Sequence, residues 1–320
     1  MNRIVIDKYI PYLDGVFEPF AEVFRLTPEE ITAATVRNAD ILIVRTRTRC
    51  NAALLDGSRV RFIATATIGF DHIDTIYCKE HGIRWIACPG CNAQAVCDYV
   101  EEALRSCEQV CGKAYRSIGI VGVGHVGSLV ARMAAQRGLQ VVLCDPLRND
   151  AGFVSAPMEA VAECDVVTFH TPLTYAGESA CPTYHLCDAT FLSRCKKDAL
   201  IINAARGGVV DEKALIESGN PCVIDCWEGE PHICTDLLRS EKTLLASFHI
   251  AGYSVQGKRN ASQTCAEAVC DWLEVGVKPA LPSFLQAKGD SEAGWLIRVT
   301  EQLRQSPCAF ETLRRNYIPR

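Results

Sequence analysis

Short apolar runs alternate with longer amphipathic segments along most of the chain. Ten of these runs have the length and composition of buried strands: Arg3–Ile6, Ile41–Val44, Phe62–Ala64, Arg84–Ala87, Ile118–Val123, Gln140–Cys144, Val166–Phe169, Leu200–Asn203, Cys222–Ile224 and Leu244–Ala246. The segments between them are typical of the helices in strand, helix, strand units. Ten strands are more than we expect in one sheet, so we predict an α/β protein with two doubly wound parallel sheets.

Two long helices follow from the same pattern. Gln94–Cys111 has small and apolar residues at helical spacing and is the natural connector between the sheets. Gln256–Val275 follows the last strand and is ended by Gly276 and the prolines at 279 and 282. Residues 283–320 contain no strand run. They hold one expected helix, Glu292–Gln305, before an arginine-rich end. This tail is too short for a core of its own. We expect it to pack on the body, to pair with another subunit or to be partly disordered.

Composition narrows the class of protein. The 320 residues are 48% hydrophobic and 22% charged, as in soluble globular proteins, and the formal net charge is −5. This charge gives no electrostatic reason to expect a nucleic acid or an anionic membrane as partner. The N-terminus enters a strand-like run directly, without the long apolar region of a signal peptide, so we expect a cytoplasmic protein.

The eighteen cysteines are mostly placed inside apolar runs, where a reduced thiol acts as a small buried hydrophobe. Examples are Cys144, Cys164, Cys222, Cys226 and Cys270. Cys88-Pro-Gly-Cys91, with Cys97 nearby, has the spacing of half a zinc site or of a redox pair. No second pair of ligands completes it, so we predict no metal site.

A nucleotide-binding turn is predicted where the strand ending near Val123 meets a helix. Gly122, Gly124 and Gly127 form a Gly-x-Gly-x-x-Gly motif with His125 and Val126 inside it. The three glycines allow a tight turn, approach of backbone to a pyrophosphate, and close packing of helix on strand. We expect His125 to be a spacer in this motif, with its side chain facing solvent or the ribose.

The next strand ends in an acid, Asp145, 18 residues after the last glycine. A carboxylate at that place binds the ribose hydroxyls of NAD and repels the extra phosphate of NADP, although Arg148 is close enough to weaken that preference. His170-Thr171 ends the strand that begins at Val166. Carboxyl ends of parallel strands line the ligand crevice, so Thr171 is expected at the cofactor and His170 to be structural.

An ordered triplet of Arg206, Glu230 and His249 follows the last three strands. A guanidinium can clamp a carboxylate with two hydrogen bonds, and Gly207-Gly208 lets backbone approach a ligand. An imidazole beside a carboxylate exchanges protons near neutral pH. We therefore predict that Arg206 binds the carboxylate of a 2-hydroxy acid, that His249 takes its hydroxyl proton, and that Glu230 orients His249 while hydride leaves C2 for the nicotinamide. Asp225, at the end of its strand, points toward the same crevice.

The glycine motif, Asn203-Ala-Ala-Arg206-Gly207, Glu230-Pro231 and His249-Ile-Ala-Gly resemble the D-2-hydroxyacid dehydrogenases that use NAD. A closer resemblance is to the members that oxidise 4-phospho-D-erythronate in vitamin B6 biosynthesis. It rests on Thr65-Ala-Thr67-Ile-Gly-Phe-Asp71-His-Ile-Asp74, Pro89-Gly-Cys91-Asn92, Cys226-Trp-Glu-Gly-Glu230-Pro231 and His249-Ile-Ala-Gly-Tyr253-Ser. The resemblance covers roughly residues 1 to 280.

The resemblance implies a Rossmann nucleotide domain inserted in a flavodoxin-like substrate domain. The expected parts are 1–98 (substrate domain, first part), 99–250 (NAD-binding domain), 251–280 (return helix) and 281–320 (shortened dimerisation segment). It implies contacts to NAD from the glycine motif with His125 and Val126, and from Asp145, Thr171, Ala204, Asp225 and Gly252. Arg45, Thr46, Thr67 and Tyr253 would meet the substrate, and the protein would be a homodimer.

The residues also favour a phosphorylated substrate on their own. Arg45-Thr-Arg47-Thr-Arg49 follows a strand and alternates cations with hydroxyls, which suits phosphate oxygens, although a solvated basic loop would have the same sequence. Lys258 and Arg259 are further candidates. The chain departs from the family at Thr46, where a serine is often found, at His125, where asparagine is usual, and in its short tail, which ends in a similar Phe310–Tyr317 segment.

Two alternatives stay open. The first is another D-2-hydroxyacid dehydrogenase, of the 3-phosphoglycerate or hydroxypyruvate type. The second is a protein without catalytic activity that senses NADH and reports its level to a partner. Such a sensor would not require Arg206, Glu230 and His249 together, so the intact triplet argues against it.

Overall fold

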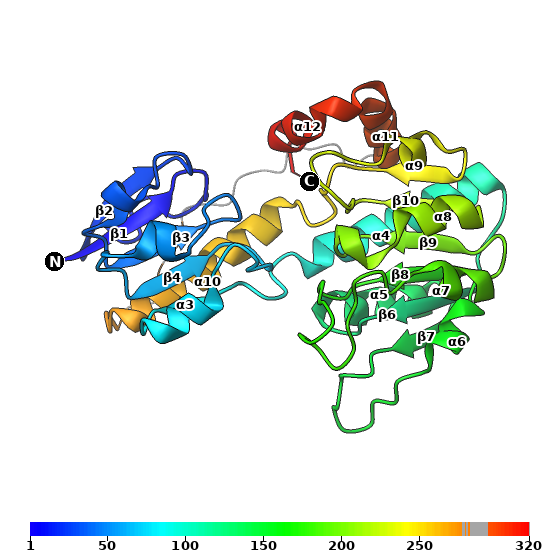
Figure 1. Cartoon of the computed structure of the whole chain (residues 1–320), viewed down its shortest axis with the longest axis horizontal. Helices are drawn as coiled ribbons and strands as arrows, with labels where there is room; N and C mark the ends of the chain where they lie inside the picture. The colour runs from blue at the N-terminus through cyan, green and yellow to red at the C-terminus, as the bar shows by residue number, and fades with distance from the viewer. Residues whose placement is uncertain (277–278, 280, 282–293, 320) are drawn as a thin grey trace. The chain divides into compact units, whose positions relative to one another are not determined.

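The computed structural model describes residues 1–276, 279, 281 and 294–319, and they fall into two compact units. The first unit contains residues 1–92 and the described part of 254–287; the second contains residues 93–253 and the described part of 288–320. Each unit is built on one parallel sheet (Figure 1).

The first unit has five strands in the order β2-β1-β3-β4-β5, all parallel. The strands are β1 (Asn2–Asp7), β2 (Ala21–Leu26), β3 (Ile41–Val44), β4 (Phe62–Thr65) and β5 (Arg84–Ile86). Its helices are α1 (Ala33–Val36), α2 (Ala52–Leu55), α3 (Thr75–Glu80) and α10 (Val255–Trp272). This strand order is that of flavodoxin-like sheets.

The second unit has six parallel strands in the order β11-β10-β9-β8-β6-β7. They are β6 (Ser117–Val121), β7 (Gln140–Cys144), β8 (Val166–Phe169), β9 (Leu200–Asn203), β10 (Cys222–Ile224) and β11 (Thr243–Ala246). Its helical segments are α4 (Ala93–Cys111), α5 (His125–Gln136), α6 (Met158–Ala162), α7 (Ala189–Arg194), η1 (Gly207–Val209), α8 (Glu212–Ser218), α9 (Thr235–Arg239), α11 (Trp295–Gln305), η2 (Pro307–Ala309) and α12 (Phe310–Asn316). The predicted α/β class with two doubly wound sheets is confirmed.

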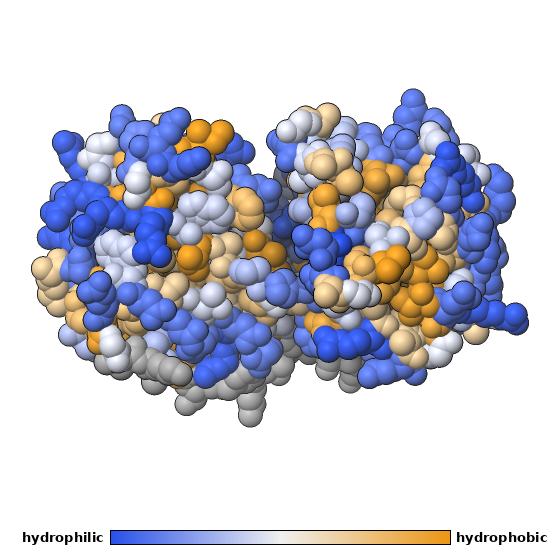
Figure 2. Space-filling model, turned by 90° about the horizontal axis from the view of Figure 1, so that it is seen from below, coloured by the Kyte–Doolittle hydropathy of each residue, from blue (hydrophilic) through white to orange (hydrophobic). Residues whose placement is uncertain are grey.

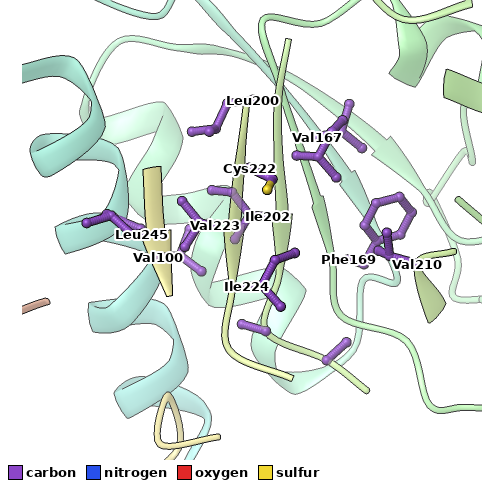
Figure 3. Close-up of a cluster of buried hydrophobic side chains, with 14 of the residues drawn as sticks. Val100, Val167, Phe169, Leu200, Ile202, Val210, Cys222, Val223, Ile224 and Leu245 are labelled. Atoms are coloured by element: carbon purple, nitrogen blue, oxygen red, sulfur yellow. The ribbon is translucent and has the colours of Figure 1, made fainter. Parts of the chain in front are cut away.

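The core of the second unit explains why its strands read as continuous apolar runs. Every residue of β8 and of β9 is buried, because helices cover both faces of the sheet. Figure 3 shows the side chains of Ile202, Val223 and Leu245, from three strands, on the side of the sheet that faces Val100 of α4, with Val167 and Phe169 on the other side. The five cysteines expected to act as buried hydrophobes are all buried.

The strand order of the second unit reverses between β6 and β8, which are neighbours in the sheet although β7 lies between them in the chain. A reversal of this kind opens a crevice at the carboxyl ends of the two strands, where ligands bind in doubly wound folds. The glycine turn after β6 and Thr171 after β8 both lie at this point.

Three sequence predictions need correction. Strand β2 was not predicted, because it lies at the sheet edge, where Glu22 and Arg25 interrupt its apolar run. The strand expected to reach Val123 ends at Val121, since Gly122 turns the backbone to φ 86°. The helix expected to end at Val275 ends at Trp272, and Glu274 has φ 55°.

The described part of the C-terminal segment, residues 294–319, contains two α-helices where one was predicted. The start expected at Glu292 lies outside the described residues, and the described helix α11 runs from Trp295 to Gln305. Thr300 Oγ1 of α11 accepts a hydrogen bond from Ala246 N (2.9 Å) and donates one to Ala246 O (3.0 Å). Helix α11 therefore covers the edge strand β11. Helix α12 was missed because its sequence reads as a polar, arginine-rich end.

The described helices include none that is long and apolar enough to cross a membrane. On the face drawn in Figure 2, hydrophilic residues are interspersed with smaller apolar patches.

Candidate active site

The glycine turn between β6 and α5 has three glycines with different steric surroundings. A Cβ on Gly127 would lie 2.0 Å from Gly122 O, so helix and strand approach too closely for any side chain. A Cβ on Gly122 would lie 2.9 Å from His170 backbone and from Thr171 Cγ2. A Cβ on Gly124, by contrast, would meet nothing within 4 Å. This open space at the N-terminus of the twelve-residue helix α5 fits a pyrophosphate.

Three polar residues lie beside this turn: Asp145, Arg148 and Thr171. Asp145 Oδ2, just beyond β7, accepts from Val123 N at 2.8 Å, which ties the acid to the turn and leaves Oδ1 for a ligand. Arg148 Nη2 lies 2.6 Å from Asp150 Oδ2, so its cation already has an anionic partner. Thr171 Oγ1 is buried and has no hydrogen-bond partner among the described residues. A buried hydroxyl without a partner is costly unless a ligand completes it, so this position also fits a bound cofactor.

The other residues expected at the cofactor lie at strand ends or on the turn. His125 is exposed and begins α5, and Val126 is half-buried beside it. Ala204 is buried directly after β9, and Gly252 is half-buried in the loop after β11. Burial lowers the pKa of His170 to about 3, so its ring is neutral, and its Nε2 lies 3.1 Å from Thr168 Oγ1.

Glu230 and His249 form a close pair. His249 Nδ1 lies 2.8 Å from Glu230 Oε2 and 3.1 Å from Oε1, and Trp227 N donates to Oε1 at 2.9 Å. Burial alone would raise the pKa of Glu230, but the His249 charge, these hydrogen bonds and the Arg314 charge together lower it. Because Nδ1 is occupied by Glu230, Nε2 is the ring nitrogen left to exchange a proton with a substrate.

His249 sits on a strained loop that Asp225 holds in place. Its φ is 59°, a left-handed conformation that is uncommon for residues other than glycine. Asp225 is 1% exposed, and its carboxylate accepts from Ser247 Oγ (2.7 Å), Ile250 N (2.7 Å) and Ala251 N (3.0 Å). These bonds on both sides of His249 stabilise the unusual backbone. The sequence placed Asp225 at the crevice but gave no signal for this supporting role.

Arg206 follows β9 and begins η1, where its Nη1 donates to Ala205 O at 2.8 Å. Gly207 allows this turn, because a Cβ there would lie 2.0 Å from Trp227 O. The loop of Arg206 is thus packed directly against the loop that leads to Glu230. Burial raises the pKa of the Cys226 thiol well above its usual value, and the charges of Asp225, Glu230, Arg206 and Arg314 all act on it. The structure therefore brings Arg206 and Glu230 to one place in the second unit.

Glu212 is a buried acid beside the pair that sequence reasoning missed. Its Oε1 accepts from Glu228 N at 2.7 Å. Burial, followed by the charges of Glu228, Glu230 and Asp211, raises the pKa of Glu212 to about 7. The residue lies at the start of α8, and an acid at a helix start is common enough to carry no signal.

Three of the predicted substrate residues, Arg45, Thr46 and Thr67, lie in the first unit, and Tyr253 lies in the second. Arg45 forms two hydrogen bonds with the fully buried Asp7, from Nε to Oδ2 (2.9 Å) and from Nη2 to Oδ1 (3.3 Å), which fixes its guanidinium. Thr46 is exposed, and Thr67 Oγ1 donates to Gly69 O at 2.8 Å. Lys258, on α10, is close enough to Arg45 that burial and then the Arg45 charge lower its pKa. The first unit thus places two positive charges near one another, and one of them, Arg45, is paired with the Asp7 carboxylate.

Comparison with known proteins identifies the family. The family model for the D-isomer specific 2-hydroxyacid dehydrogenase NAD binding domain matches residues 101–251. A protein of Bacteroides fragilis named erythronate-4-phosphate dehydrogenase is 42% identical over an alignment covering 98% of this chain and 95% of that protein. The alignment therefore includes most of the C-terminal segment.

Solved structures agree on the architecture. A Thermus thermophilus protein of known crystal structure has a TM-score of 0.73 and 26% identity, and the match covers 88% of this chain and 99% of the other. The NAD⁺-bound 3-phosphoglycerate dehydrogenase of Entamoeba histolytica has a TM-score of 0.71 and 23% identity, covering 89% and 99%, a likeness in fold alone.

The chain belongs to the D-isomer specific 2-hydroxyacid dehydrogenases and, within them, to the erythronate-4-phosphate dehydrogenases. It is an NAD-dependent oxidoreductase.

Proposed function

We propose that the protein oxidises 4-phospho-D-erythronate with NAD to 2-oxo-3-hydroxy-4-phosphobutanoate, in the synthesis of pyridoxal 5'-phosphate. The observation that carries this is the Glu230–His249 pair, 2.8 Å apart, in the unit that contains the NAD-binding match. The relative of that name, 42% identical along nearly the whole chain, supports the substrate.

In this mechanism His249 is the base. Its Nε2 takes the proton of the C2 hydroxyl, and the Glu230 carboxylate stabilises the imidazolium that forms. Arg206 binds the substrate carboxylate through its guanidinium and aligns C2. NAD, when bound, supplies the hydride acceptor. The substrate thus loses one proton and one hydride, and the products are the 2-oxo acid, NADH and a protonated His249.

The residues proposed to hold NAD fit the groups that they would meet. Gly122, Gly124 and Gly127, with His125 and Val126, would place backbone around the pyrophosphate. Asp145 would bind the ribose hydroxyls. The remaining contacts would come from Thr171, Ala204, Asp225 and Gly252, of which Thr171 offers a buried hydroxyl without a partner among the described residues.

The phosphate of the substrate would be bound by the first unit. Arg45 and Thr46 would contact it. Lys258 would contact it as well, because its positive charge is close enough to Arg45 for the two to repel one another. A phosphate between them would relieve this repulsion. Thr67 and Tyr253 are the other proposed substrate contacts.

We further propose that the protein is a cytoplasmic homodimer with a small phosphorylated hydroxy acid as its ligand. Family resemblance supports the dimer, and light scattering on the purified protein tests it. A monomer at micromolar concentration would contradict this part alone.

The function is tested by following NADH formation with 4-phospho-D-erythronate, D-erythronate and 3-phospho-D-glycerate. Charge-assisted bonds to the phosphate predict a kcat/KM for 4-phospho-D-erythronate at least about tenfold above that for D-erythronate. Preference for 3-phospho-D-glycerate would instead favour another dehydrogenase of the family. Tight NADH binding without turnover of any of the three acids would favour the NADH sensor.

A further inference from the structure

The C-terminal helix α12 places an arginine against the catalytic pair. Arg314 Nη1 lies 3.8 Å from Glu230 Oε2, and Arg314 Nε donates to the hydroxyl of Tyr253 at 3.1 Å. The Arg314 side chain is only 24% exposed. A cation that is largely removed from water must be compensated by partners. Here they are the proposed catalytic acid Glu230, the proposed substrate residue Tyr253, and Glu311, whose Oε2 lies 3.9 Å from Arg314 Nη1.

The position of α12 is fixed by packing against the loop that carries His249. Phe310, at the start of α12, is 1% exposed. Tyr317, just beyond its end, contacts the ring of Phe248 edge-on, with ring centroids 5.9 Å apart, and lies 6.3 Å from the ring of Tyr253. Since Phe248 directly precedes His249, the tail and the catalytic loop are held to one another. Figure 1 shows α12 in red at the C-terminal end of the second unit.

We propose that Arg314 is a positioning residue for proton transfer: it keeps Glu230 ionised, limits how strongly Glu230 favours the imidazolium of His249, and holds the Tyr253 hydroxyl in place. This inference rests on the proposed roles of Glu230 and His249. Through Arg314, the short C-terminal segment would contribute to the active site as well as to dimerisation.

The charge of Arg314 matters because most of the other charged groups around Glu230 and His249 are acidic. Glu230 Oε2 faces both His249 Nδ1 and Arg314 Nη1, so Arg314 and a protonated His249 share one carboxylate oxygen. The other charged or titratable groups around the pair are Arg206, Glu212, Asp225, Tyr253 and Glu311. Three of these are acids, which favour protonation of both Glu230 and His249. Arg314 opposes them, and it is the arginine whose charge lowers the pKa of Glu230.

The test compares Arg314→Met and Arg314→Lys with the wild-type protein, using kcat/KM for 4-phospho-D-erythronate oxidation across pH. Arg314→Met is expected to move the acid limb of the profile to higher pH by about half a pH unit or more, because His249 then holds its proton more tightly. It should also raise KM, because the Tyr253 hydroxyl loses the hydrogen bond from Arg314 Nε. Arg314→Lys keeps the charge and should leave the limb in place. Arg315→Met is the matched control, since Arg315 lies on the same helix and pairs with Glu311 at the surface.

An NMR titration of the labelled His249 imidazole, without substrate, separates this inference from the proposed function. Arg314→Met is expected to move the midpoint of that titration to higher pH whether or not 4-phospho-D-erythronate is the substrate. If the methionine variant does not fold, Arg314→Gln removes the same charge and takes its place. An unchanged imidazole titration, an equal shift in Arg315→Met, or a loss of kcat at all pH values without movement of the limb would overturn the proposal.

Discussion

The carboxylate of Glu230 lies 2.8 Å from Nδ1 of His249, and the two residues come from different strand ends, 19 positions apart in the chain. The charge of His249 is the main reason why the pKa of the buried Glu230 is lowered rather than raised. This carboxylate stabilises the imidazolium that forms when His249 accepts a proton from a hydroxyl group.

Replacing Glu230 by Gln should lower kcat/KM for 4-phospho-D-erythronate by about 10² or more, because the imidazolium loses its stabilising anion. The measurement is NADH formation at pH 7.5, with the NADH dissociation constant as a second readout that should stay unchanged. Glu228→Gln is the matched control, since Glu228 lies in the same loop and bonds to Tyr184 and His185 instead. Equal losses in both variants would show that loop structure, and not the anion, matters.

Two alanine substitutions in the glycine turn should separate folding from cofactor binding. Gly127→Ala puts a Cβ 2.0 Å from Gly122 O, so it should both lower the melting temperature and abolish NADH binding. Gly124→Ala meets nothing within 4 Å in the protein and should melt like the wild type. Its Cβ would occupy the space assigned to the pyrophosphate, so NADH affinity should still fall by about tenfold or more. Fluorescence titration of NADH checks both, and undiminished affinity of Gly124→Ala would place the pyrophosphate elsewhere.

Glu212 makes stability depend on pH. Its pKa is raised from an ordinary 4.5 to about 7, so between these values the folded state binds more protons than the unfolded state and stability falls as pH rises. The shift corresponds to at most about 3 kcal/mol. Glu212→Gln keeps an oxygen for Glu228 N and cannot ionise, so it should melt above the wild type at pH 8, by roughly 2–4 °C per kcal/mol. Near pH 5 the two proteins should melt together, and a constant difference at both pH values would contradict this account.

Lys258 should matter for phosphorylated substrates alone. Lys258→Met removes one of the two cations proposed to bind phosphate, and loss of a charge-assisted bond predicts an increase in KM for 4-phospho-D-erythronate of about tenfold or more. The same variant assayed with D-erythronate is the control and should show an unchanged KM. An equal increase for both acids would mean that Lys258 supports the fold of the first unit and does not bind phosphate.

Strands were predicted most accurately from the sequence where both faces of the sheet are buried, because such strands are continuous apolar runs. Strands such as Leu200–Asn203 were predicted to the residue, whereas the edge strand Ala21–Leu26 was missed because it is partly solvated and carries charges. The triplet of Arg206, Glu230 and His249 was predictable because parallel strands end at one edge of their sheet. Its roles remain predictions, as do the cofactor and substrate contacts.

The supporting residues could not be predicted because their function depends on tertiary contacts. Asp225 holds the His249 loop through backbone donors, and nothing in a local pattern indicates which amides a carboxylate accepts from. Arg314 lies 84 positions after Glu230 in a polar segment, and only the packing of α12 brings it to 3.8 Å. Lys258 is likewise far from Arg45 in the chain, and only the folding of the first unit brings the two charges close enough to interact.

The central claim is tested most directly by hydride transfer in His249→Ala. Enzyme saturated with NAD is mixed with 4-phospho-D-erythronate, and NADH absorbance is followed through a single turnover. We predict a rate at least about 10² below that of the wild type, with NADH affinity and melting temperature preserved, because the alcohol keeps its proton. Single-turnover formation of NADH at the wild-type rate would contradict the assignment of His249 as the base.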